Sequence, residues 1–143
     1  MRLERVADEE VLYRRIQPIH LKHERSKVRL SSQAFADKSW RPSVDRACLI
    51  GNDPAQARQH ESDLVVSISA RQVREIHTVV QQNAQGEEIQ RHAIDVEPVP
   101  LEYNPAHAEI FGTPGFANKR VFQRLLERLA FLAHFEISPD AQR

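Results

Sequence analysis

"ANKRVFQRLLERLAFLAHF", residues 117–135, is the stretch that most directly indicates how this chain folds. Its apolar residues recur at intervals of three and four, at Val121, Phe122, Leu125, Leu126, Leu129 and Leu132. This spacing is typical of an α-helix that turns one apolar face toward a core. We therefore predict a long amphipathic helix over residues 116–133. We expect its buried residues to include Phe122, Leu125, Leu129 and Leu132.

Upstream of this helix, several short segments have the composition of β-strands. Residues that favour strands are frequent at 11–16, 63–69, 77–82, 87–99 and 108–111. The connector "NAQGE" (83–87) has the length of a hairpin turn, so its flanking strands are predicted to pair, as a sheet edge or a curved ribbon. Residues 43–51 fit a strand or a short helix. The predicted fold class is α+β: a single domain over residues 1–143, with a small, mostly antiparallel sheet and a long C-terminal amphipathic helix.

Charge and composition narrow the classes of function. The chain has 20 basic and 20 acidic residues. This balance argues against general electrostatic binding of nucleic acid but leaves a local arginine patch possible. The single cysteine, Cys48, excludes an internal disulfide and a cysteine-based zinc site. His20 and His23 have the spacing of metal ligands on a helix, but no third ligand accompanies them, so we expect no metal and no cofactor. No apolar segment has the length of a membrane span, so we expect a cytoplasmic protein without a membrane partner.

The segment 17–42 is polar and irregular, and we predict a long polar loop there, with one short extended piece at 28–30. Loops of this length often serve binding, and this one contains Phe35 and Trp40, which we expect to be exposed. Arg120, Arg124 and Arg128 form a stripe on the polar side of the predicted helix. The stripe is a candidate site for phosphates or an acidic partner, and a solvated helix face is the structural alternative.

A second group of polar residues lies at the predicted strand ends. The candidate catalytic residues are Arg15, Ser32, Asp45 and His107, and the candidate binding residues beside them are Arg14, Ser31 and Asn104. His107 follows an Asn-Pro turn, where it can act as a general base, bind phosphate, or simply complete the turn by bonding a carbonyl group. We hypothesise that His107 shares a pocket with Arg15 and the Ser31–Ser32 pair. No G-x-S-x-G elbow or glycine-rich phosphate loop is present, so no motif supports a serine hydrolase or a nucleotide-binding fold.

Four sequence blocks carry a resemblance to known proteins. They are "LYRRI" (12–16), "SSQAF" (31–35) followed by Asp37, "SVD" (43–45) and "NPAHAEIFG" (104–112). In this order they resemble a group of short, stand-alone bacterial proteins. The resemblance indicates that these blocks belong to one structural unit, and it implies no catalytic mechanism. The hairpin around Gly86 is longer here, and the last helix is richer in arginine, than in that group.

A more distant likeness is to ADP-ribosyltransferase-type toxins, and it concerns residue order alone. Those proteins carry an early arginine or histidine, a serine-bearing strand and a late acid. Arg14 or Arg15, Ser31 or Ser32, and Glu109 occupy those places in order.

Two classes of function follow. The favoured one is a bacterial accessory or binding protein, which engages a protein encoded in the same operon, or nucleic acid, through the 17–42 loop and the C-terminal helix. The alternative is a small enzyme acting on nucleotide or nucleic acid, ADP-ribosyltransferase-like or nuclease-like, that uses Arg15, Ser32, Asp45 and His107. The two classes predict different geometries, because only the enzyme requires those four side chains to meet in one cleft.

Overall fold

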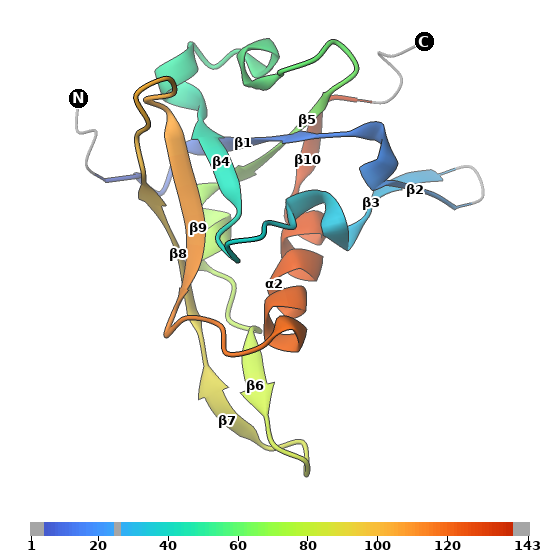
Figure 1. The fold of residues 1–143 in the computed structure, drawn as a ribbon, viewed down its shortest axis with the longest axis vertical. Helices are drawn as coiled ribbons and strands as arrows, with labels where there is room; N and C mark the ends of the chain where they lie inside the picture. Colours follow the sequence, from blue (N-terminus) through green and yellow to red (C-terminus); the bar gives the residue numbers. More distant parts are fainter. Residues whose placement is uncertain (1–4, 25–26, 139–143) are drawn as a thin grey trace.

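A six-stranded antiparallel sheet with one long helix packed on one face forms the body of the protein (Figure 1). The computed structural model describes residues 5–24 and 27–138. The strand order is β10-β5-β1-β4-β9-β8. The elements are β1 Val11–Ile16, β4 Ser43–Arg46, β5 Leu64–Ser69, β8 Ala93–Pro98, β9 His107–Thr113, β10 His134–Ile137, the short helix α1 Ala70–Arg74 and the long helix α2 Lys119–Leu132. The predicted α+β class is confirmed.

Helix α2 forms as the apolar spacing predicts. Its side chains Val121, Phe122, Leu125, Leu126 and Leu129 are buried, and Leu132 is half-buried. The Asn118 side chain caps the first turn by accepting a hydrogen bond from the Val121 amide at 3.0 Å. The helix begins at Lys119 rather than at 116. It ends at Leu132, and the chain then continues into β10, a strand that we did not predict.

The two faces of the sheet have different partners. Leu12 and Ile16 of β1 face α2, together with Leu64, Val66 and Ile68 of β5. Side chains on the opposite face include Tyr13 and Val65, which pack against Ala47 and Ala57. Ala47 and Ala57 belong to the 3₁₀ turns Ala47–Ile50 and Pro54–Ala57. Because both faces are covered at β5, its first five residues are all buried.

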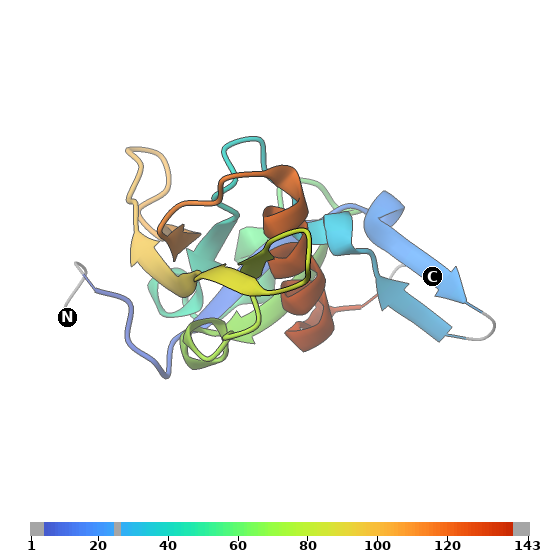
Figure 2. The ribbon, with the colours of Figure 1, turned by 90° about the horizontal axis from the view of Figure 1, so that it is seen from below.

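The prediction of a long polar loop at 17–42 is wrong for the described residues. The chain forms a 3₁₀ turn at Pro18–His20, the hairpin of β2 Leu21–Glu24 and β3 Lys27–Leu30, and a 3₁₀ turn at Ser32–Phe35. The hairpin projects from the body (Figure 2). Its strands are almost entirely exposed, so they lack the alternation of apolar and polar residues by which a strand is recognised.

The two aromatic residues expected to be exposed in that segment are instead packed. Phe35 has no exposed surface. Trp40 is half-buried and stacks on Phe122 of α2, with 5.8 Å between the ring centroids. Its φ of 61° lies in the left-handed region, which residues other than glycine rarely adopt. The surrounding structure must therefore hold the backbone of Trp40 in this conformation.

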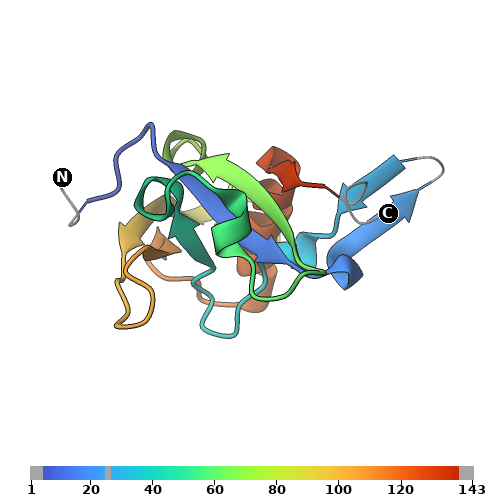
Figure 3. The same ribbon diagram turned by 90° about the horizontal axis from the view of Figure 1, so that it is seen from above.

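The predicted hairpin around Gly86 is also present. Its strands are β6 Val80–Gln82 and β7 Glu88–Arg91, which form a separate ribbon, and β7 leads into β8 at the edge of the large sheet. Viewed from above, the turns between β4 and β5 lie in front of β1, on the face of the sheet opposite α2 (Figure 3). Within the described part of the chain, no helix combines the length and apolar character needed to cross a membrane.

Candidate functional site

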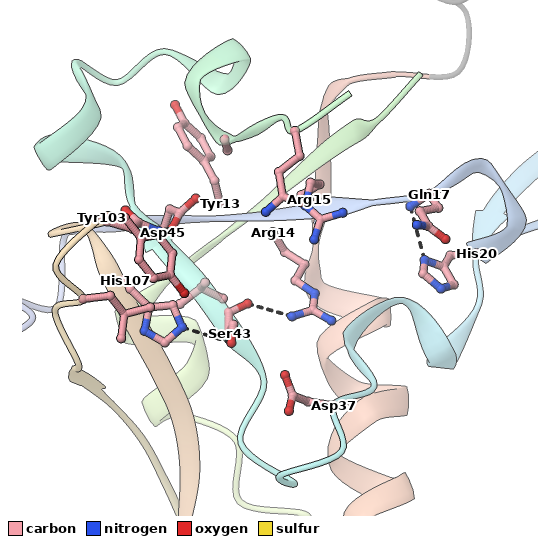
Figure 4. A pocket seen from close by; sticks show the side chains of 15 residues that line it. Tyr13, Arg14, Arg15, Gln17, His20, Asp37, Ser43, Asp45, Tyr103 and His107 are labelled. Carbon is pink, nitrogen blue, oxygen red and sulfur yellow. Dashed lines mark hydrogen bonds between the residues drawn. The ribbon is translucent and has the colours of Figure 1, made fainter. Parts of the chain in front are cut away.

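A polar cavity of about 420 Å³ lies where β1 and β4 separate (Figure 4). The two strands pair only at Leu12↔Arg46 and Tyr13↔Asp45, so the remainder of β1 has no ladder with β4. The strands β1, β4 and β9 and the neighbouring turns supply its polar lining: Tyr13, Arg14, Arg15, Gln17, His20, Asp37, Ser43, Asp45, Gln59, Tyr103, Asn104 and His107.

His107 is held between two partners. Its Nδ1 lies 2.9 Å from the carbonyl oxygen of Val99, and its Nε2 lies 3.1 Å from Oγ of Ser43. A carbonyl oxygen can only accept a hydrogen bond, so Nδ1 carries the hydrogen. In the neutral ring Nε2 is then the unprotonated nitrogen, and the Ser43 hydroxyl donates to it.

Asp45 and Asn104 fix the turn that carries His107. Asp45 lies opposite His107 in the register of β4 and β9. Nδ2 of Asn104 donates to Oδ1 of Asp45 at 2.8 Å, and Oδ1 of Asn104 accepts from the Ala106 amide at 3.3 Å. The turn is therefore attached to β4 by side chains as well as by the strand ladder.

Arg14 places a positive charge at the cavity without a carboxylate partner. Its guanidinium donates to three carbonyl oxygens, of Ala34 at 3.1 Å, Ala36 at 3.0 Å and Ser43 at 2.8 Å. Among the residues that the structure describes, no carboxylate lies within ion-pair distance of it. Burial lowers the pKa of Arg14, an effect that the more distant Asp37 opposes. Two of its five N–H groups are not used by these three bonds.

Arg15 and His20 extend the positive region. The Arg15 side chain is 33% exposed, and Nη1 lies 3.8 Å from Oδ2 of Asp63, at the limit of an ion pair. Burial lowers the pKa of His20, and the charges of Arg14 and Arg15 lower it further. The nitrogen Nδ1 of His20 accepts from the Gln17 amide at 3.3 Å. The charges of both arginines therefore act on the part of the cavity where His20 lies.

Five of the candidate residues from the sequence meet at this cavity: Arg14, Arg15, Asp45, Asn104 and His107. Ser31 and Ser32 do not line it, so the hypothesis that placed them beside His107 is wrong. Ser31 caps the turn at 32–35 by accepting from the Gln33 amide at 3.1 Å, and Ser32 accepts from Nε2 of Gln123 on α2 at 2.8 Å.

Ser43 supplies the hydroxyl that the sequence led us to expect from the Ser31–Ser32 pair. The signal was present in "SVD", because residues two apart on a strand share a face, and Asp45 was already a candidate. Tyr13, His20 and Tyr103 also line the cavity and were not predicted to do so.

The other candidate binding residues lie elsewhere. Arg120 is exposed, Arg124 donates to Oε1 of Gln82 at 3.0 Å, and the Arg128 guanidinium lies 5.0 Å from the centre of the Phe131 ring. Two of the three arginines in the stripe therefore already contact neighbouring side chains. Phe35 is buried in the core, and Trp40 lies in a separate depression beside α2.

The acid considered for an ADP-ribosyltransferase-like site is engaged outside the cavity. Oε1 of Glu109 accepts from Nε of Arg41 at 2.7 Å, and Glu97 binds the same guanidinium. Glu109 does not line the cavity. In the described ranges, no three or more His, Cys, Asp or Glu side chains are grouped so as to hold a metal ion.

Comparisons of the chain with protein-family models, with curated proteins and with solved structures returned no match.

Proposed function

We propose that this protein binds, in the cavity between β1, β4 and β9, a ligand that presents a carboxylate or phosphate group. The observation that carries the proposal is the buried guanidinium of Arg14. Three carbonyl groups hold its guanidinium in one orientation, and no carboxylate among the described residues lies within ion-pair distance. A desolvated guanidinium is stabilised by an anion that accepts its remaining N–H groups.

The rest of the lining suits the same ligand. Arg15 adds a second guanidinium with a weak carboxylate partner, and the charges of Arg14 and Arg15 both act on His20, which lines the same cavity. Tyr103 is 86% exposed at the rim. An exposed ring beside an anion site offers an apolar surface to the remainder of the ligand.

The test is a titration of isotopically labelled protein with inorganic phosphate and with acetate, followed by NMR. We expect concentration-dependent shifts at Ser43, His20 and the Arg14 side chain that saturate. Arg14→Gln and Arg15→Gln should weaken binding, with folding of each variant checked by thermal melting. Arg128→Gln is the matched control, because Arg128 is exposed on α2. Shifts that never saturate, or that persist unchanged in both cavity variants, would contradict the proposal.

A second candidate function is binding of a protein partner by the β2–β3 hairpin and α2. The observation in its favour is a groove of about 560 Å³ between them, lined by Val28, Leu30 and Phe131. Phe131 is 75% exposed. An exposed aromatic side chain beside a groove with apolar and charged lining residues is typical of an interaction site. If a protein from the same bacterial operon binds there, Phe131→Glu should abolish its co-purification and Arg120→Glu should not.

A further inference from the structure

The hydroxyl of Ser43 is positioned as a nucleophile. The Val99 carbonyl fixes the hydrogen of His107 on Nδ1, and this leaves the lone pair of Nε2 directed at the Ser43 oxygen, 3.1 Å away. A general base within hydrogen-bond reach of a hydroxyl, itself oriented by a third group, is the arrangement that activates a serine. The Val99 carbonyl group orients the His107 ring, as the carboxylate orients the histidine in the Ser-His-Asp triad.

The surroundings of Ser43 fit this role. Its side chain lies at the cavity, because β4 has no ladder with β1 beyond Asp45. The Arg14 guanidinium lies next to it, since Nη1 of Arg14 donates to the carbonyl oxygen of Ser43 itself at 2.8 Å. A fixed cation at this position stabilises the negative charge that develops when a serine attacks a carbonyl carbon. Unlike a G-x-S-x-G serine, Ser43 lies on a strand, and its role rests on geometry.

We propose that the cavity hydrolyses an ester whose acyl part carries a carboxylate or phosphate group, with Ser43 as nucleophile and His107 as general base. The Ser43 oxygen attacks the carbonyl carbon, and its proton passes to Nε2 of His107. The carbon–oxygen bond to the alcohol breaks, and the alcohol leaves with that proton. Water then attacks the acyl-Ser43 ester, again losing a proton to His107, and Ser43 recovers the proton as the acid leaves. Arg14 and Arg15 bind the anionic group, so the substrate class rests on the proposed function.

The roles of the neighbouring residues follow. Asp45 does not orient His107 in this arrangement, since its carboxylate accepts a hydrogen bond from Nδ2 of Asn104. Asp45 and Asn104 are therefore positioning residues that hold the turn before His107. Ser43 and His107 are the groups that would touch the reacting atoms.

The experiment is covalent labelling with an alkyl fluorophosphonate, which reacts with activated serines. The Ser43 oxygen would form a bond to phosphorus, fluoride would leave, and His107 would take the hydroxyl proton. We expect one adduct on the intact wild-type protein, mapped to Ser43 by peptide mass spectrometry. Ser43→Ala should not be labelled, and His107→Gln should be labelled about 100- to 10,000-fold more slowly. Ser62→Ala, at an exposed serine outside the cavity, should react like the wild type.

Several outcomes would overturn the inference. They are absence of an adduct on the folded wild-type protein, an adduct on another serine, or an unchanged rate in folded His107→Gln. The residue that carries the adduct on the wild-type protein tests the assignment of Ser43 as nucleophile even if a variant fails to fold. Phosphate binding by Ser43→Ala, followed by NMR, separates the two proposals. If the anion binds and Ser43 is inert, only the hydrolase is wrong. If Ser43 is labelled and no anion binds, the anion site and the anionic substrate class that rests on it are wrong, and the assignment of Ser43 as nucleophile stands.

Discussion

The Arg46 guanidinium lies against the Glu10 carboxylate through two parallel hydrogen bonds, Nε to Oε1 and Nη2 to Oε2, both at 2.8 Å. Arg46 is 1% exposed. The same carboxylate accepts from the Ala7 amide at 2.7 Å and lies 3.4 Å from the Cys48 sulfur. The pair therefore joins the segment before β1 to β4, the strand that carries Ser43.

Replacement of Glu10 by Gln should strongly destabilise the protein. The substitution removes the Glu10 carboxylate that accepts two hydrogen bonds from the buried Arg46, and removal of one partner of a buried pair costs about 3–5 kcal/mol. The measurement is urea unfolding at neutral pH. Glu88→Gln is the matched control, since Glu88 pairs with Arg91 at the surface and its loss should be too small to measure. Equal effects of the two substitutions would show that Arg46 is adequately solvated without Glu10.

The same pair predicts how stability depends on pH. Burial raises the pKa of Glu10, but hydrogen bonds from Arg46, the Ala7 amide and Cys48 outweigh it and hold the pKa below the ordinary value of 4.5. A lowered folded-state pKa gives stability that is present above the unfolded-state value and lost as the pH falls through the folded-state value. The difference in unfolding free energy between wild type and Glu10→Gln should therefore be constant above about pH 5 and shrink below it. A difference that grows on acidification would contradict this.

Leu125 should be the most sensitive position on α2. It has no exposed surface, so Leu125→Ala removes buried methyl groups and leaves a cavity, at a cost of about 2–5 kcal/mol. Phe131→Ala on the same helix should change the unfolding free energy by less than about 0.5 kcal/mol, because Phe131 is mostly exposed. A loss below that size at Leu125 would contradict the packing of α2 on the sheet.

Gly112 is expected to tolerate no side chain, whereas Gly115 should accept one. A Cβ at Gly112 would lie 2.7 Å from Cζ of Phe116, and a Cβ at Gly115 would meet nothing within 4 Å. Phe116 packs against His92 and Phe122, so its ring cannot move freely. Gly112→Ala should therefore cost about 1–3 kcal/mol and Gly115→Ala much less, as measured by thermal unfolding. Similar melting temperatures for the two variants would show that the Phe116 ring can move aside.

The amides of the β2–β3 hairpin should exchange with solvent much faster than those of β5. The hairpin strands pair only with each other and are almost entirely exposed, whereas β5 pairs with β1 and β10 and is buried. Local opening of the hairpin therefore exposes few apolar groups. Native-state hydrogen exchange measures the difference directly. A partner that binds the 17–42 segment should slow exchange there, and equal protection of the two regions in the free protein would contradict the expectation.

The most readily predicted elements are those that bury a continuous apolar run or one apolar face. Strand β5 is of the first kind and helix α2 is of the second. Strand β10 was missed because "HFEI" alternates without a buried face and exists through its pairing with β5, about 70 residues earlier in the chain. Pairing with a distant strand is not encoded in a local pattern. The β2–β3 hairpin pairs locally, but only an extended piece at 28–30 was predicted there, because its strands are almost entirely exposed and lack an alternation of apolar and polar residues.

The candidate site was predictable only in part, because one of its contacts depends on the register of two paired strands. His107 and Asp45 stand out because they are polar residues at the edges of strand-like segments. Ser43 was missed, because its contact with His107 depends on a register in which Ser43 lies opposite Glu109 and reaches His107 diagonally. The adjacent Ser31 and Ser32 were more conspicuous in the sequence, but their hydroxyls cap a turn and bond to α2.

The stacking of Trp40 on Phe122 gives the protein an intrinsic optical probe. Trp40 is the single tryptophan in the chain. Its indole joins the segment before β4 to α2, and the same segment passes Asp37 of the cavity lining. The fluorescence emission of this protein therefore reports on one interface alone. A red shift of this emission would signal that α2 has separated from the 31–42 segment.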